Sequence, residues 1–198
     1  MVVIHYTAMQ TAIAARDRLC DPQAEVSAHY VICPKGQIWH LVAEEQRAWH
    51  AGAGQWGTVR DVNSHSIGIE LANTGAQPFS EPQMAVLDDL LIGIQTRWGI
   101  APKGVIGHAD MALGRKIDPG PRFDWRRLAR LGLSIWPEVR AGGDFYRDAQ
   151  RFGYALPEGG EALLLQAFRE RFRPGAGGAV CDADTALMAD LAARWPAG

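Results

Sequence analysis

The chain lacks a surplus of charge of either sign and lacks a long apolar run. Its 198 residues carry 20 Lys and Arg against 22 Asp and Glu, which gives a net charge of −2. Residues 1–136 hold thirteen basic and thirteen acidic side chains, so they offer no basic surface of the kind that binds nucleic acid. No apolar run approaches the roughly 18–20 residues that span a bilayer. We therefore expect no nucleic-acid partner and no transmembrane segment.

Cysteine is also scarce, with three residues spread over the chain at Cys20, Cys33 and Cys181. An odd number without a close pair does not form a disulfide framework, and no Cys-x-x-Cys motif indicates structural zinc. Free thiols suit a reducing compartment, and the N-terminus has no signal-peptide pattern. We expect a cytoplasmic protein. Residues 2–4 already have the pattern of a core strand, which allows for further residues upstream in the natural chain. If those residues include a leader, we expect a periplasmic or outer-membrane-attached protein instead.

Strand patterns alternate with helix patterns through residues 1–136. Strands are predicted at 2–6, 29–33, 37–42, 66–71 and 105–106, and helices at about 8–19, 80–98 and 124–131. Thr7 is the expected cap of the first helix, and Ser80 with Gln83 forms a predicted capping box for the second. The alternation predicts an α/β catalytic domain over 1–136, with a mixed central sheet flanked by helices.

The last part of the chain has a different pattern. Residues 137–143 (PEVRAGG) have the composition of a linker. Three short helices are predicted after it, at 144–152, 160–172 and 182–195. We therefore predict a second, small three-helix domain over residues 144–198, a size that can fold alone.

Two histidines and one carboxylate lie where buried strands end. His5 closes the apolar strand at 2–6, His108 follows the strand at 105–106, and Asp118 comes ten residues later. Two imidazoles and one carboxylate would give zinc three ligands and leave a fourth position for water. A hydrogen-bonded structural role is the alternative for a single histidine such as His5.

Four segments in order connect these residues to a known family. They are VIHYT at 3–7, SAHY at 27–30, SIGIEL at 66–71, and GHADMALGRKIDPG at 107–120. Together they resemble the zinc-dependent N-acetylmuramoyl-L-alanine amidases, the type-2 amidases related to peptidoglycan recognition proteins. The tail, with Gly153-Tyr154, LQAF at 165–168 and CDADT at 181–185, is similar to the helical peptidoglycan-binding domain that accompanies some of these enzymes.

The resemblance implies a site and a reaction. It implies zinc held by His5, His108 and Asp118, Glu70 as the carboxylate that activates the zinc-bound water, and Lys116 as the stabiliser of the oxyanion. The substrate would be peptidoglycan or a muropeptide, cut at the amide between the lactyl group of (anhydro-)N-acetylmuramic acid and L-alanine. We expect a monomer. Burial on an apolar strand would raise the pKa of Glu70 toward that of a useful base, and an exposed strand-end carboxylate is the alternative.

Four further residues are candidates for substrate binding: Trp49, His50, Asn73 and Arg115. The first two lie in the long glycine-rich stretch 43–65, and a loop of that length inside a compact domain is usually functional. Trp49 could stack on sugar or peptide or anchor its own loop, and Asn73 could bind the stem peptide or form a turn.

Two other functions remain open at this point. One is a non-catalytic peptidoglycan-binding protein on the same fold, which the presence of Glu70 and Lys116 argues against. The other is a zinc peptidase that cuts within the stem peptide, which would need a different substrate cleft.

Overall fold

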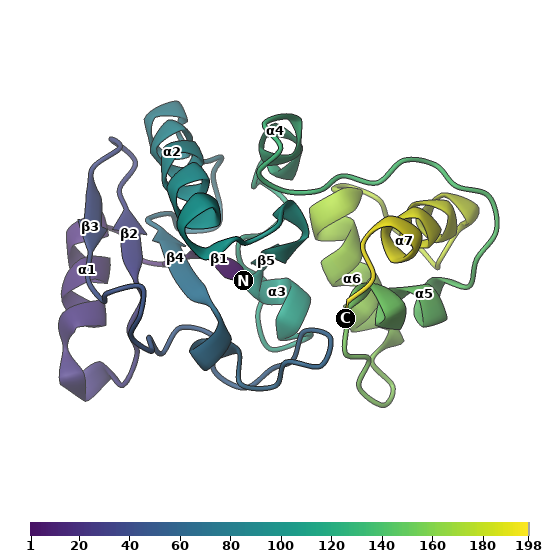
Figure 1. Ribbon diagram of the computed structural model, residues 1–198, viewed down its shortest axis with the longest axis horizontal. Coiled ribbons are helices and arrows are strands. Elements are labelled where there is room, and N and C mark those ends of the chain that lie inside the picture. The colour runs from purple at the N-terminus through teal and green to yellow at the C-terminus, as the bar shows by residue number, and fades with distance from the viewer. Residues whose placement is uncertain (198) are drawn as a thin grey trace.

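The structure is a computed structural model that describes residues 1–197, and a mixed sheet forms the middle of its N-terminal part (Figure 1). Within these residues the sheet has five strands in the order β3-β2-β4-β1-β5. The strands are β1 (Val2–Tyr6), β2 (Tyr30–Ile32), β3 (Ile38–His40), β4 (Ile67–Leu71) and β5 (Val105–Gly107). The mixed sheet predicted from the sequence is confirmed.

Strand β1 lies in the interior of the sheet and sets the position of the site. It runs parallel to β4 on one side and to β5 on the other, in a register that pairs His5 with Glu70 and Ile4 with Gly107. Strand β2 is also parallel to β4, whereas β3 is antiparallel to β2. Parallel strands end at one edge of the sheet, where ligands bind in open α/β folds. The residues that end β1 and β4 and that follow β5 therefore meet at this edge.

Different elements cover the two faces of the sheet. Ile4 and Ile69 pack with Leu87 of the long helix α2, whereas Val3 and Ile106 belong to a second apolar cluster that reaches the C-terminal helices. The helices are α1 (Ala12–Cys20), α2 (Glu81–Trp98), α3 (His108–Met111), α4 (Trp125–Arg130), α5 (Phe145–Phe152), α6 (Glu161–Phe172) and α7 (Asp182–Arg194), with short 3-10 turns at Pro22–Ala24, Val62–His65 and Pro102–Gly104. Among the described residues, no helix combines the length and apolar character needed to cross a bilayer.

Helix α1 begins four residues later than predicted from the sequence. Thr7, the expected cap, stays at the sheet edge, where its backbone N–H donates to Leu71 O (3.1 Å) and its hydroxyl to Asn73 O (3.4 Å). Thr11 caps the helix instead, because its Oγ1 accepts from the backbone N–H of Ala14 at 3.1 Å. The first turn therefore starts only after the chain has left the sheet.

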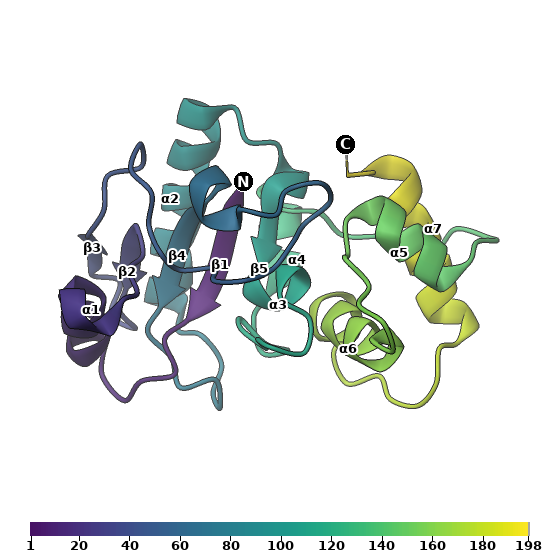
Figure 2. The same cartoon turned by 90° about the horizontal axis from the view of Figure 1, so that it is seen from below.

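The C-terminal helices pack beside β5 (Figure 2). Helix α5 lies against α7, and α6 lies against α3. Phe152, Leu164 and Phe168 of this helical unit share one buried cluster with Val3 and Ile106 of the sheet. The hydrophobic core is therefore continuous across the segment 137–143 that the sequence predicts as a linker.

Candidate metal centre and active site

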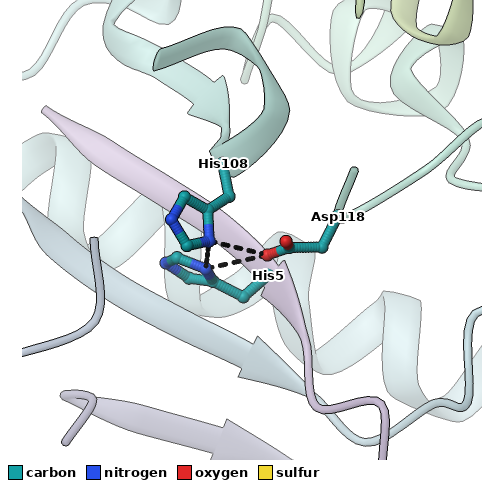
Figure 3. Close-up of side chains that lie close together, drawn as sticks. All are labelled: His5, His108 and Asp118. Carbon is teal, nitrogen blue, oxygen red and sulfur yellow. Dashed lines mark hydrogen bonds and ion pairs between the residues drawn. The ribbon is translucent and has the colours of Figure 1, made fainter. Parts of the chain in front are cut away.

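Two strand ends and one loop bring the predicted ligands together (Figure 3). His5 lies near the end of β1, and His108 is the first residue of α3, directly after β5. Asp118 is in the following loop, where its backbone carbonyl accepts from the N–H of Ala109 at 2.8 Å. This backbone bond closes the loop from 109 to 118 and returns Asp118 to the side of His108.

Three ligand atoms converge on one point. Nδ1 of His5 lies 2.9 Å from Oδ2 of Asp118 and 2.9 Å from Nδ1 of His108, and the His108 to Asp118 distance is 3.0 Å. All three side chains are buried. Two imidazole nitrogens and one carboxylate oxygen at this spacing are a donor set that can hold a metal ion.

The outer nitrogens of both imidazoles have partners that fix the ring orientation. Nε2 of His108 donates to Ala51 O at 2.8 Å, and Nε2 of His5 donates to Nδ1 of His50 at 2.9 Å. The N–H of the His50 ring then faces the hydroxyl of Ser66 at 3.3 Å. Outer bonds of this kind leave Nδ1 free to bind a metal and are typical of ligating histidines.

Burial and mutual contacts also set the charge of the donor set. Burial and the neighbouring His108 lower the pKa of His5 to about 4. Burial alone would raise the pKa of Asp118, but the close contacts with the rings of His108 and His5 hold that pKa well below its usual range. At neutral pH His5 is therefore neutral and Asp118 is ionised, which are the forms that bind a divalent metal.

Glu70 lies beside His5 on the neighbouring strand. Its Oε2 atom is buried and has no hydrogen-bond partner among residues 1–197. Burial, and then the charge of Asp118, raise the pKa of Glu70 to about 8, against the opposing effect of Lys116. A carboxylate with a raised pKa next to the donor set is placed to exchange protons near neutral pH.

These residues line a cavity of about 430 Å³ at the carboxyl edge of the sheet. Of the residues predicted from the sequence, it brings together His5, Trp49, His50, Glu70, His108, Arg115, Lys116 and Asp118. Lys116 is exposed to the cavity, whereas Arg115 also donates to Ala51 O and Ala53 O of the opposite loop. His50 is 9% exposed, and its Nδ1 accepts from Nε2 of His5, so it contacts a candidate metal ligand.

Asn73 lies in the turn after β4 and is 4% exposed. Its side-chain oxygen accepts from the N–H of Gly75 at 2.7 Å, and its amide donates to Gln77 O at 3.2 Å. Both ends of the Asn73 side chain are therefore bonded within the turn. This is the turn-forming role that the sequence analysis gave as the alternative to peptide binding.

Sequence reasoning missed Arg18 of α1, which lines the same cavity together with Ala15 and Leu19. The signal was available, because positions 15, 18 and 19 have the spacing of one helix face. The polar character of this short helix obscured it, since α1 has a single buried residue, Ala15, among those described.

The family model described as N-acetylmuramoyl-L-alanine amidase matches residues 1–121. This range contains the three donor residues and Glu70, and the chain belongs to this amidase family.

Similar proteins match the helical unit as well. AmiD, the N-acetylmuramoyl-L-alanine amidase of Escherichia coli K12, is 34% identical over 96% of this chain and 80% of its own length. The structure of E. coli AmiD with the substrate anhydro-N-acetylmuramic acid-L-Ala-D-gamma-Glu-L-Lys has a TM-score of 0.88 at 32% identity, covering 98% of this chain and 89% of that one. AmpDh3 of Pseudomonas aeruginosa, in complex with an anhydromuramic pentapeptide, has a TM-score of 0.89 at 32% identity, covering 100% and 92%. The sheet and the C-terminal helices therefore have the fold of these amidases.

Proposed function

We propose that this protein hydrolyses muropeptides at the amide between the lactyl group of anhydro-N-acetylmuramic acid and L-alanine. The observation that carries the proposal is the buried donor set of His5, His108 and Asp118 with Glu70 beside it in one cavity. The bound ligands of the similar AmiD and AmpDh3 structures support this substrate class. We propose the anhydro form on the same basis.

We further propose that the resident metal is zinc. Two neutral imidazoles and one carboxylate are a usual ligand set of catalytic zinc, which keeps a fourth position for water or substrate. When bound, zinc supplies Lewis-acid activation of water and of a carbonyl oxygen. The outer bonds of His5 and His108 support this assignment, since they fix both rings with the Nδ1 atoms beside the Asp118 carboxylate, where these residues would hold the ion.

Two side chains of the protein would carry out proton transfer and charge stabilisation. Glu70 accepts a proton from the attacking water as its oxygen bonds to the lactyl carbonyl carbon. The same carboxyl then delivers that proton to the nitrogen of L-alanine as the C–N bond breaks. The ammonium group of Lys116, exposed in the cavity, lies where it can stabilise the negative charge that develops on the carbonyl oxygen.

Mass spectrometry of the products from a purified anhydromuropeptide tests the reaction. We expect two products, the free anhydro sugar acid and an intact peptide that begins with L-alanine. Fragments cut within the peptide would identify a peptidase instead. Binding without any product would indicate a non-catalytic peptidoglycan-binding protein.

Metal analysis tests the ligand assignment separately. Purified protein should hold about one zinc ion, as expected for three ligands and one water, and His108→Ala should remove most of it. Zinc retained at the wild-type level in this variant would contradict the assignment. Thr96→Ala, on the exposed side of α2, is a control that should keep the metal.

A further inference from the structure

The C-terminal helical unit contacts the metal-ligand segment through a buried carboxylate. Asp110 lies two residues after His108, on helix α3, and is 2% exposed. Its Oδ2 accepts from the backbone N–H of Gly107 at 2.8 Å, which closes the first turn of the helix. The orientation of Asp110 and that of the His108 backbone are therefore linked through one short turn.

Two residues of the helical unit hold this carboxylate. Nη1 of Arg171, on α6, donates to Oδ2 of Asp110 at 2.5 Å, and the hydroxyl of Tyr154 donates to Oδ1 at 2.7 Å. Burial and the charge of Asp110 raise the pKa of Tyr154 well above its ordinary value, so it remains a donor at neutral pH. Both Asp110 oxygens are thus bound from outside the sheet domain.

Arg171 also connects Asp110 to the strand that precedes it. Its Nη2 donates to Val105 O of β5 at 2.9 Å, and its guanidinium carbon lies 4.2 Å from the centre of the Trp125 ring. The side chain is 2% exposed. A single arginine therefore binds both β5 and α3, the two elements that meet at His108.

Helix α6 contacts the chain between His108 and Asp118 at a second point, closer to Asp118. Gly114 has a φ of +71°, and a Cβ atom there would lie 2.6 Å from a methyl group of Leu163. The left-handed backbone favours glycine at this position, and the glycine leaves room for the Leu163 side chain. Helix α6 therefore contacts the chain at Asp110 and at Gly114, both of which lie between His108 and Asp118.

We propose that Tyr154, Leu163 and Arg171 form a clamp that positions His108 and Asp118 for metal binding. The helical unit is then part of the scaffold of the metal centre, in addition to any role in binding the cell wall. Arg171 and Tyr154 act as positioning residues, because they contact Asp110 and neither the substrate nor the metal. This inference rests on the proposed metal site.

Metal affinity of the full-length protein tests the clamp. Competition with a chromophoric chelator gives the zinc affinity, and the absorption spectrum of the cobalt-substituted protein reports the ligand geometry. We expect Arg171→Met to weaken zinc binding by about 10-fold and Tyr154→Phe by several-fold. Both losses should be smaller than or at the low end of the roughly 10–100-fold cost of losing a direct outer partner of a metal ligand, because both residues act through Asp110. Both variants should alter the cobalt spectrum, and Arg171→Lys should restore part of the affinity.

Arg169→Met is the matched control. Arg169 is on the same helix, is 6% exposed, and forms a buried ion pair with Asp184 inside the helical unit. This variant loses a comparable pair without contact to α3, so its zinc affinity should stay within about 2-fold of wild type, below the effect of an outer-partner loss. Equal weakening by Arg169→Met and Arg171→Met would show general destabilisation and overturn the clamp.

Tyr154→Phe keeps the test decisive if Arg171→Met does not fold, because it removes only one hydroxyl. Unchanged zinc affinity and an unchanged cobalt spectrum in this variant would overturn the proposal. A wild-type protein that binds no zinc would instead contradict the proposed function, which is a separate outcome.

Discussion

Glu70 combines three features at the end of strand β4. It is paired in register with His5, one of its oxygens is buried without a partner in the described chain, and its pKa is raised to about 8. An unpartnered buried carboxylate oxygen costs stability, so its position is better explained by proton transfer than by folding.

The residue-scale prediction for catalysis concerns Glu70→Gln. The amide keeps the shape of the side chain but cannot accept the proton, so kcat should fall by about 10²–10⁴-fold. Zinc content, measured on the same sample, should remain at the wild-type level. Activity within a few-fold of wild type would move the base role to another residue.

The raised pKa of Glu70 also predicts how the stability of the metal-free protein depends on pH. Its pKa is about 8 in the folded state against an ordinary 4.5, so the folded state binds more protons between these values and stability falls as pH rises. The lowered pKa of His5, about 4 against 6.5, has the opposite effect and ends at pH 6.5.

Between pH 6.5 and 8, the titration of Glu70 therefore lowers the stability without the opposing effect of His5. Urea unfolding of the chelator-treated protein should show a loss of up to about 2 kcal/mol over this window, from 1.36 kcal/mol per pH unit. Glu70→Gln should remove the slope. A slope that persists in this variant would assign the titration to another group.

At the scale of elements, the long stretch 43–65 packs closely against strand β4 at a glycine. The ring of His50 lies against Gly68, where a Cβ atom would be 2.3 Å from the His50 Cγ. Gly68→Ala should displace this ring and with it the bond to His5. We expect a loss of about 1–3 kcal/mol in unfolding free energy, as for other overpacked sites, and weaker zinc binding.

Gly177→Ala provides the control for this variant. In the described chain, a Cβ atom at position 177 has open space around it, so stability and zinc affinity should both stay close to wild type. If Gly68→Ala behaves like Gly177→Ala, His50 does not depend on the close approach to β4.

Sequence patterns predicted elements well where burial alone decides them. Strand β1 was predicted with its bounds, because its apolar run is buried on both faces of the sheet. The capping box of α2 was wrong for a tertiary reason. The side chain of Gln83 donates to Ile32 O and Ala72 O, and Ser80 donates to Pro34 O. These polar side chains join the helix to the sheet, which local sequence does not specify.

The residues of the site could be predicted from the sequence more readily than the contacts between them. His5 lies near the end of β1 and His108 directly follows β5, and such strand ends are visible in the sequence. The complete ligand set with Asp118 was implied by the resemblance to the amidase family. The contact of His50 with His5 depends on how a long loop folds back over β4, and the contact of Arg171 with Asp110 joins positions 61 residues apart. Neither has a local pattern, since both depend on tertiary packing.

At the scale of the whole molecule, the sequence suggested that the tail could be removed. A truncation after Trp136 would keep zinc and cut soluble muropeptides, and would lose activity mainly on intact sacculi, if 144–198 were a separate binding domain. The structure favours a different outcome, because the helical unit packs against the sheet domain. Ile106 and Met111 share a cluster with Phe152 and Phe168, and truncation would expose them.

The truncated protein should therefore be less stable than the full chain. Exposing two large apolar side chains lowers the free energy of unfolding by about 3–5 kcal/mol. In a domain of this size, this loss lowers Tm by roughly 10 °C or more. Calorimetry of both proteins, with zinc content and activity on soluble and polymeric substrates, checks this. An unchanged Tm with activity lost only on sacculi would support an independent wall-binding domain.

The order of the strands has a consequence for synthesis. Strand β1 is made well before its partners, which are β4 at residues 67–71 and β5 at 105–107. Because β1 lies between these two strands, it must wait for much later residues before it can pair. The donor set is complete only once Asp118 has been made, and Asp110 gains its arginine only after residue 171 has been added. The donor set and the side chains that hold its segment are therefore assembled only after residue 171 has been made, long after His5 has left the ribosome.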